Sequence, residues 1–263
     1  MESTPTQSST SNNEEGNPKQ HQQRILPPLT TLFEVNVFKE SFKFNAAHFV
    51  AFPGFRERLH GHEYRLKIRL LGSRVIGQDG YVLDFGDVKA VTKKVCKNLN
   101  EYFICPMYSP VLQINKIRGK GDEGDGGDDG DDDENIESIE IICEDGAKFL
   151  FPRIDCALLP IAHSTAEELA IHLWGEVLLG LDATFLVKRG IHTMEVTCAE
   201  AVGQEAVFRK EIPDTNDKDQ IRELCNVRSY ISSGAAFPRP CPTARGNALK
   251  NTQIGYNCNL CGK

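Results

Sequence analysis

The chain has 263 residues, 40% hydrophobic and 25% charged, which is typical of a soluble globular protein with one or two domains. It contains no apolar run of about eighteen residues, so a membrane-spanning helix is not expected. The net charge of −7 comes from one acidic segment, and without its nine carboxylates the rest carries about +2. A nearly neutral remainder without a basic stripe argues against a nucleic-acid partner.

Residues 1–32 have little apolar content and no signal-peptide core, so a disordered tail and a cytoplasmic protein are expected. From Phe33 the run FEVNVFKESFKFNAAHF alternates apolar and polar residues, and EYRLKIRLLG does the same after a Pro-Gly turn signal. The two runs predict a pair of antiparallel strands.

Three histidines belong to these strands: His48, His60 and His62. A His-x-His pair in a strand places both imidazoles on one face, and a third from the neighbouring strand can complete a tripod. Three nitrogen ligands with an open fourth position are typical of catalytic zinc. The alternative is that each histidine is an ordinary surface or core residue.

After Gly80, apolar residues at helical spacing predict a first helix capped by Asp84. The glycine-rich acidic stretch 116–135 is expected to be a disordered insertion between two strands, because it has nothing to bury. Calcium binding is the alternative, but the EF-hand spacing is absent. A strand with a turn at Asp145-Gly146 follows.

A second helix is predicted from STAEELAIHLWGEVLLGL, with Ser164 and Glu167 as a capping box. The last strand pair, MEVTCAEAVGQEAVF, breaks at Gly203 and places Cys198 and Glu200 on one face. Residues 213–263 are expected to be a mostly disordered tail with one short helix in DKDQIRELCNV.

Nine cysteines are scattered along the chain, which predicts buried thiols in a reducing compartment rather than a disulfide framework. Cys258 and Cys261 form half of a zinc-ribbon pattern, which supports no more than a tail motif or an intermolecular site. The order of elements predicts an α+β fold with two helices on one face of an antiparallel sheet. Oligomerisation into a closed barrel would cover its edges.

Five motifs in this order carry a resemblance to a known family: FNAAHF, LHGH with its strand, GYVLDFGDVK, STAEEL, and the last strand with its glutamate. Residues 33–212 resemble the 6-pyruvoyltetrahydropterin synthase family, which includes the 6-carboxytetrahydropterin synthases. The resemblance implies the tunnelling fold, a homohexamer of two trimers with active sites between subunits, and a lyase that eliminates triphosphate from 7,8-dihydroneopterin triphosphate.

The resemblance also implies the ligands and the substrate contacts. It assigns a zinc ion to His48, His60 and His62, which would bind the side-chain hydroxyls of the substrate. Glu200 matches the glutamate that anchors the pterin ring, and Thr165 matches a threonine that contacts it. Glu167 is better explained as a cap.

Two departures from the family pattern bear on the reaction. The catalytic cysteine before HGH is absent, and Glu57 is the base available there. A branch with glutamate in this setting is implied to form 6-hydroxymethyl-7,8-dihydropterin for folate synthesis. The usual Asp-His pair is replaced by Asn100 and Glu101, of which only Glu101 could act as a base; alternatively, both simply end the first helix.

Three functions therefore stand open at this point. The preferred prediction is a zinc-dependent lyase with Glu57 and Glu101 as catalytic residues. The second is ordinary 6-pyruvoyl synthesis for tetrahydrobiopterin. The third is a non-catalytic paralogue that binds zinc and a pterin.

Overall fold

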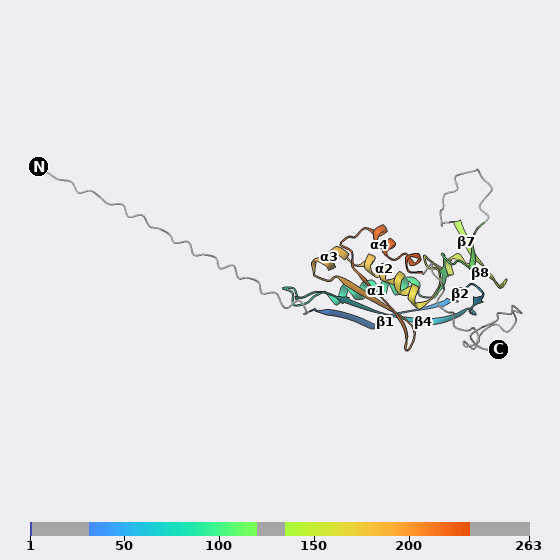
Figure 1. The fold of residues 1–263 in the computed structure, drawn as a ribbon, viewed down its shortest axis with the longest axis horizontal. Helices are drawn as coiled ribbons and strands as arrows, with labels where there is room; N and C mark the ends of the chain where they lie inside the picture. Colours follow the sequence, from blue (N-terminus) through green and yellow to red (C-terminus); the bar gives the residue numbers. More distant parts are fainter. Residues whose placement is uncertain (2–31, 120–134, 232–263) are drawn as a thin grey trace, which may run out of the picture.

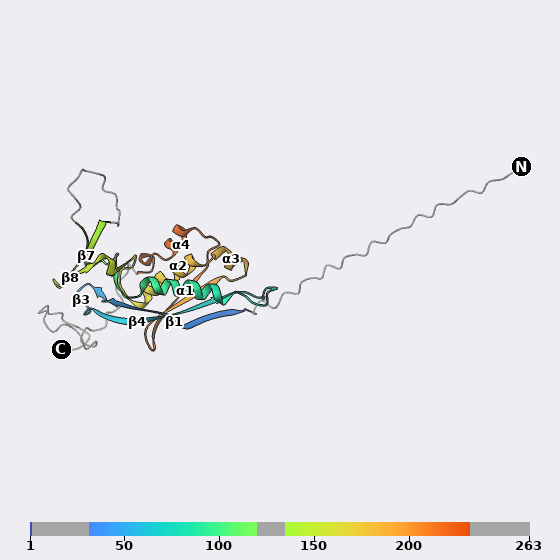
Figure 2. The same cartoon turned by 180° about the vertical axis from the view of Figure 1, so that it is seen from behind.

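The computed structural model describes residue 1 and residues 32–119 and 135–231 (Figures 1 and 2). Within these ranges, six strands form the main sheet in the order β11-β10-β4-β1-β5-β9. Their bounds are β1 Glu34–His48, β4 His60–Leu71, β5 Tyr102–Pro106, β9 Cys156–Leu159, β10 Thr193–Ala201 and β11 Gln204–Glu211.

The antiparallel pair predicted from the two alternating runs is β1 with β4, and its register places His48 opposite His60. The predicted last pair is β10 with β11, which continues the sheet beyond β4. The expectation of a wholly antiparallel sheet is wrong, because β5 pairs in parallel with both β1 and β9. Parallel neighbours need a crossover connection, and the chain between the parallel neighbours β1 and β5 returns through β4 and then α1.

All the longer helices lie on one side of the main sheet, as both views show. Helix α1 (Phe85–Leu99) begins at the predicted cap, since the Asp84 carboxylate accepts a hydrogen bond from the backbone N–H of Gly86. Helix α2 is Ala166–Gly180, α3 is Ala183–Lys188, and α4 is Lys218–Leu224. Among the helices of the described ranges, none combines the length and apolar character that a membrane crossing requires.

The capping box predicted for α2 is wrong in its residues. Thr165 is the N-cap, and its hydroxyl accepts from the backbone N–H of Glu168. The Ser164 hydroxyl instead donates to the carbonyl oxygen of Phe49, 2.9 Å away, and is buried there. Glu167 is exposed. The first turn of α2 is therefore fixed by the second hydroxyl residue, while the first joins α2 to the segment after β1.

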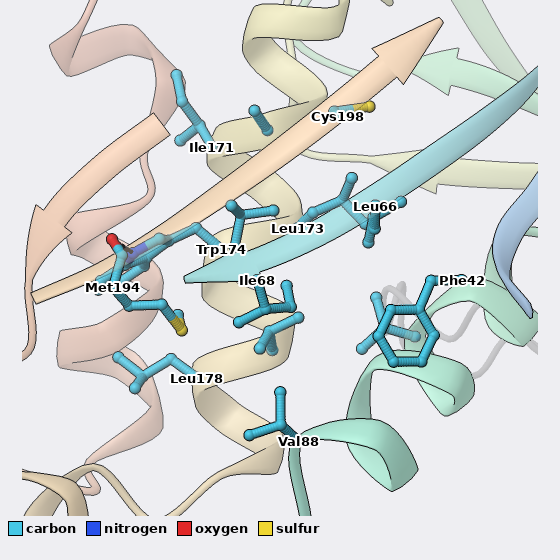
Figure 3. Close-up of a cluster of buried hydrophobic side chains, with 14 of the residues drawn as sticks. Phe42, Leu66, Ile68, Val88, Ile171, Leu173, Trp174, Leu178, Met194 and Cys198 are labelled. Carbon is cyan, nitrogen blue, oxygen red and sulfur yellow. Dashed lines mark hydrogen bonds between the residues drawn. The ribbon is translucent and has the colours of Figure 1, made fainter. Parts of the chain in front are cut away.

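Side chains from β4 and β10 pack against α1 and α2 to form the core (Figure 3). Trp174 of α2 is fully buried, and its indole N–H donates to the carbonyl oxygen of Met194 in β10 at 2.9 Å. A buried indole with its one donor satisfied is stabilising as well as apolar. Leu66 and Ile68 alternate with charged residues along β4, which explains why this strand could be read from its sequence.

A second, smaller sheet consists of β6 (Leu112–Arg118), β7 (Ile136–Cys143) and β8 (Lys148–Pro152). The acidic insertion lies between β6 and β7, as predicted, although residues 116–118 expected in it belong to β6. The Asp145-Gly146 turn joins β7 to β8, and Gly146 has the positive φ of 81° that such a turn requires. This sheet packs on Phe49 and Phe103 through Phe149 and Phe151.

The short strands β2 (Ala51–Phe52) and β3 (Phe55–Arg56) form a hairpin before β4. The one-turn helices η2 (Arg153–Asp155) and η3 (Val227–Ser229) complete the described elements. The predicted helix after Pro213 is α4, and Ile221 and Val227 are buried, so the packed part continues past residue 212. The N-terminal tail, the centre of the insertion and Cys258–Cys261 lie outside the described residues.

Candidate metal and substrate site

The histidines gather because of the strand register. His48 lies opposite His60, and His62 follows two residues along β4, so the three imidazoles share one face. One ring nitrogen from each lies within 4.8 Å of the others. Gly61 between them faces the opposite side, where a Cβ would come within 3.3 Å of the Ala46 carbonyl oxygen. The structure thus assembles the predicted tripod.

Backbone carbonyls orient two of the three rings. Nδ1 of His48 lies 2.8 Å from the carbonyl oxygen of Ser164, and Nδ1 of His60 lies 2.7 Å from that of Arg58. A carbonyl oxygen only accepts hydrogen bonds, so each Nδ1 carries the proton. The lone pair is then on Nε2 of each ring. A ring fixed in this way by its other nitrogen is the usual setting of a metal-ligating histidine.

One buried atom indicates that a cation fits this site. Nε2 of His48 is buried and makes no hydrogen bond within the described residues. It lies 3.2 Å from Oε1 of Glu200, and Nε2 of His62 lies 3.4 Å from the same oxygen. In the neutral imidazole both the nitrogen and the carboxylate oxygen are acceptors, so a positive charge is needed between them. Zinc accepts imidazole nitrogen and carboxylate oxygen ligands.

Burial and the charges around the tripod favour a neutral His62 and an ionised Glu200 at neutral pH. Burial lowers the pKa of His62. The negative charge of Glu200 opposes this, and the neighbouring His48 and His60 lower the pKa further. The contact with His48 lowers the pKa of Glu200, whose carboxylate stays ionised. The Tyr64 hydroxyl donates to Oε1 of Glu200 at 3.4 Å, and burial raises the pKa of this phenol.

Glu57 lies at the same end of the sheet, in the segment that joins β3 to β4. Its backbone N–H donates to the carbonyl oxygen of Val50, and its Oε2 accepts from the backbone N–H of Val50 at 3.2 Å. Val50 follows His48 by two residues. The negative charge of Glu57 opposes the lowering of the His62 pKa by burial and adds slightly to the raising of the Tyr64 pKa by burial. The half-buried Glu57 carboxylate is therefore held at the end of the sheet that carries the tripod.

Thr165 reaches the site through the N-terminus of α2. The preceding carbonyl, that of Ser164, holds His48, so the first turn of α2 and the tripod are in direct contact. The Thr165 hydroxyl already accepts from Glu168 N–H at 3.4 Å. It keeps its own O–H as a donor for a ligand.

The pair Asn100 and Glu101 ends α1 and fastens it to β1. Oδ1 of Asn100 accepts from the backbone N–H of Asn45 at 2.9 Å, and the N–H of Glu101 donates to the Asn45 carbonyl at 2.6 Å. Glu101 has a φ of 68°, unusual for a residue with a side chain. Its exposed side chain lines a hollow of about 540 Å³ together with His62 and Asp155. Both residues thus serve the helix end, and Glu101 also borders His62.

Several contributors were not found by sequence reasoning. Tyr64 follows His62 by two residues, so the same alternation that revealed the tripod places it on that face. The Ser164 carbonyl has no signal in the side-chain sequence. Glu168 accepts from the N–H groups of Ala162 and His163, at 2.6 and 2.9 Å, and so holds the loop that presents the Ser164 carbonyl.

The described cysteines offer no substitute for the missing catalytic thiol. Burial raises the pKa of Cys96, Cys105 and Cys225 to about 12 and that of Cys156 to about 11. Cys198 is the one on the strand that carries Glu200, and burial raises its pKa as well. These thiols behave as small apolar side chains, as predicted.

The fold and the histidine tripod define an α+β protein with a candidate three-histidine metal site. A profile of the family described as 6-pyruvoyl tetrahydropterin synthase matches residues 37–211. The chain belongs to this family. The resemblance inferred from the five motifs is thereby confirmed.

Individual relatives agree with this assignment. A solved structure of the Plasmodium vivax 6-pyruvoyl tetrahydropterin synthase is 38% identical, covers 69% of this chain and 99% of its own, and has a TM-score of 0.60. The Plasmodium falciparum enzyme gives 37% identity with the same coverage and TM-score. A Methanocaldococcus jannaschii protein provisionally named a 6-carboxy-5,6,7,8-tetrahydropterin synthase is 27% identical over 179 residues, 68% of this chain and 96% of its own.

Two further structures of the Plasmodium vivax protein are variants of a catalytic residue, in which a glutamate is replaced by alanine or by cysteine. In that relative, therefore, a glutamate is described as catalytic.

Proposed function

We propose that this protein is a zinc-dependent lyase that converts 7,8-dihydroneopterin triphosphate to 6-hydroxymethyl-7,8-dihydropterin, a folate precursor. The observation that carries the proposal is the half-buried Glu57 carboxylate, hydrogen-bonded to the backbone of Val50 two residues after His48, at a place without a cysteine. The catalytic glutamate of the Plasmodium vivax relative supports the assignment of this role to Glu57.

The residues have separate tasks in this proposal. Zinc, held by His48, His60 and His62, supplies a positive charge that acidifies a substrate hydroxyl next to it. Glu200 accepts hydrogen bonds from the N–H groups of the pterin ring, and Tyr64 keeps its carboxylate in place. Thr165 offers its hydroxyl to the ring from the start of α2.

Glu57 acts as the base. Removal of a proton from a side-chain hydroxyl turns its carbon into an aldehyde and breaks the bond to the carbon attached to the ring. The electron pair of that bond passes to the ring-attached carbon, which the pterin stabilises, and that carbon then takes up a proton. One carboxylate can both remove the first proton and return the second. Glu101, which borders the hollow shared with His62, is the candidate for assisting this transfer.

Product analysis tests the proposal. Zinc-loaded protein is incubated with the triphosphate, and the pterins are separated by chromatography. We expect the 6-hydroxymethyl product, a loss of at least about a hundredfold in rate for Glu57→Gln, since general base catalysis contributes ~10²–10⁴-fold, and no change for Glu205→Gln, an exposed glutamate paired with Lys67. Intact substrate after long incubation would contradict the proposal.

The same experiment separates the alternative of 6-pyruvoyl synthesis. That activity would yield the 6-pyruvoyl product from the unaltered protein. If Glu57 determines which product forms, the unaltered protein should give no 6-pyruvoyl product, and the Glu57→Cys variant should form it.

A non-catalytic role is the second candidate, because Asn100 and Glu101 are engaged in ending α1 where the family carries a proton-relaying pair. Calorimetry with the substrate distinguishes it. Tight binding without any turnover would support a pterin-binding paralogue and exclude the lyase.

We also propose the hexameric barrel of the family. Within the described residues, the edge strands β9 and β11 each have one neighbour in the main sheet, so each has a free side that a second subunit can pair. Sedimentation should give about six times the mass of the chain, and a monomer at micromolar concentration would refute this assembly.

A further inference from the structure

The segment that carries Glu57 has little structure of its own to hold it. Strands β2 and β3 have two residues each, with Phe52 opposite Phe55, and a turn at Gly54 with a φ of 76° joins them. A two-stranded hairpin of this length is not stable alone. Two hydrogen bonds with Val50 tie Glu57 to the segment after β1, and contacts from elsewhere must hold the hairpin that precedes it.

The turn between β7 and β8 supplies these contacts. Oε2 of Glu144 accepts from the backbone N–H of Gly54 at 2.9 Å. Oδ2 of Asp145 accepts from Nε and Nη2 of Arg56, at 3.0 and 2.8 Å. In both views this turn's sheet lies beside the β2–β3 hairpin (Figures 1 and 2). Glu144 and Asp145, which are distant in the sequence, thus hold the turn and the second strand of the short hairpin.

Arg56 also contacts Glu57 directly. Its Nη1 donates to the carbonyl oxygen of Glu57 at 2.9 Å. Its guanidinium also lies over two rings, 5.8 Å from the centre of Phe49 and 5.5 Å from that of Phe149. These contacts use different nitrogens and the face of the planar guanidinium, which a lysine could not reproduce.

The two side chains are partly covered, which favours a defined geometry, although Asp145 lies in an exposed turn. The side chain of Arg56 is 13% exposed and that of Asp145 is 22% exposed. Burial opposes ionisation of Asp145, but the hydrogen bonds from Arg56 and from the backbone N–H of Ala147 outweigh it and lower the pKa of its carboxyl. A charged, partly buried, two-point contact is stronger and more directional than a surface ion pair.

We infer that Arg56 and Asp145 are positioning residues, which set where the Glu57 carboxylate stands relative to the histidine tripod. The inference rests on the role proposed above for Glu57. It extends the functional site to the second sheet. The β7–β8 turn makes no hydrogen bond or ion pair with the three histidines within the described residues, and it would control the base through Arg56.

Kinetics and hydrogen exchange test this together on the zinc-loaded full-length protein. Asp145→Asn and Arg56→Lys should each lower kcat about tenfold, with KM changed less than twofold and zinc content unchanged. Asp79→Asn is the matched control, because it removes the carboxylate from another Asp–Arg pair, with Arg189, remote from the hairpin. It should leave kcat unaltered.

Two readouts separate positioning from general destabilisation. Asp145→Asn should lower kcat no further in a Glu57→Gln background, since a displaced base cannot matter once the base is absent. It should also speed amide hydrogen exchange in residues 50–58 at least tenfold while α2 keeps its exchange rates. An equal tenfold loss in both backgrounds, or unchanged exchange in residues 50–58, would overturn the inference.

The outcomes also distinguish the inference from the proposed function. Unchanged exchange with an inactive Glu57→Gln refutes the positioning pair and leaves the lyase standing. Faster exchange with a fully active Glu57→Gln refutes the role of Glu57 and, with it, the positioning role.

Discussion

Oε1 of Glu200 lies 3.2 Å from Nε2 of His48, and the proton of that imidazole is on its other nitrogen, where it is donated to the Ser164 carbonyl. A buried imidazole nitrogen therefore faces a carboxylate oxygen of the partly exposed Glu200, and both atoms are acceptors. This arrangement is unfavourable without a cation and favourable with one, so the protein carries a charge pattern prepared for a metal ion.

Zinc binding should follow from this pattern. The purified protein is expected to hold one zinc per chain by elemental analysis, and His48→Ala should lose it, since two imidazoles bind zinc far more weakly than three. His192→Ala, in an exposed histidine on the approach to β10, is the control and should keep the full amount. Stoichiometric zinc in His48→Ala would exclude the tripod as the site.

The stability of the metal-free protein should depend on pH in one direction. The pKa of His62 is lowered from its ordinary 6.5, so below that pH the unfolded chain binds a proton that the folded chain resists. The pKa of Glu200 is lowered from 4.5, so its contribution is complete above that value and is lost as the pH falls through the folded pKa. The midpoint of thermal unfolding should therefore fall steadily on acidification below about pH 6.5.

His62→Gln provides the check on that assignment. Between pH 6.5 and the lower pKa of His62 in the folded protein, this variant should show a weaker dependence of unfolding free energy on pH. The difference in slope should correspond to at most one proton taken up on unfolding. A metal-free protein that became more stable on acidification through this range would contradict the sign worked out above.

The hydroxyls of Ser164 and Thr165, at the start of α2, should contribute to stability in different ways. Thr165→Ala should cost about 1 kcal/mol of unfolding free energy, because it removes the N-cap, and Thr165→Ser should cost little. Ser164→Ala should cost about 1–3 kcal/mol, since it leaves the buried Phe49 carbonyl without its donor. Glu167→Ala should be nearly neutral in urea denaturation. A large effect of Glu167→Ala with none for Thr165→Ala would restore the capping box predicted from the sequence.

Two substitutions of Glu101 distinguish the effect of its backbone strain from any role of its carboxylate in the reaction. With a φ of 68°, Glu101→Gly should stabilise the protein by roughly 0.5–1 kcal/mol, because glycine adopts this conformation without steric cost. Glu101→Gln keeps the strain and removes the charge. If Glu101 assists proton transfer, both variants should lose activity equally, whereas full activity in both would assign this residue to the helix end alone.

The sequence predicted the β1–β4 pair, both long helices and the tripod, because each depends on a local period. Apolar residues and histidines two apart in β4 necessarily share a face. The parallel partners of β5 could not be predicted in this way, since the short run YFICP is compatible with either direction and its neighbours are chosen by distant segments.

The same limit applies to the site. Ser164 and Thr165 are equally good caps by type, and only the buried Phe49 carbonyl decides between them. Arg56 and Asp145 are 89 positions apart, and neither stands in a motif that indicates the other. Local patterns therefore located the three histidines, whereas the contacts that orient them depend on the folded chain.

The base of the acidic insertion is closed by a hydrogen bond from the N–H of Gly119 to the carbonyl of Asn135, at 3.2 Å. The eight residues of β7 separate this closure from the turn that grips Arg56, a span of roughly 25 Å. Because the ends of the insertion are already joined, a doubling of its length costs only about 0.6 kcal/mol of closure entropy. The segment is thus a natural position for grafting a tag or reporter without disturbing the β2–β3 hairpin.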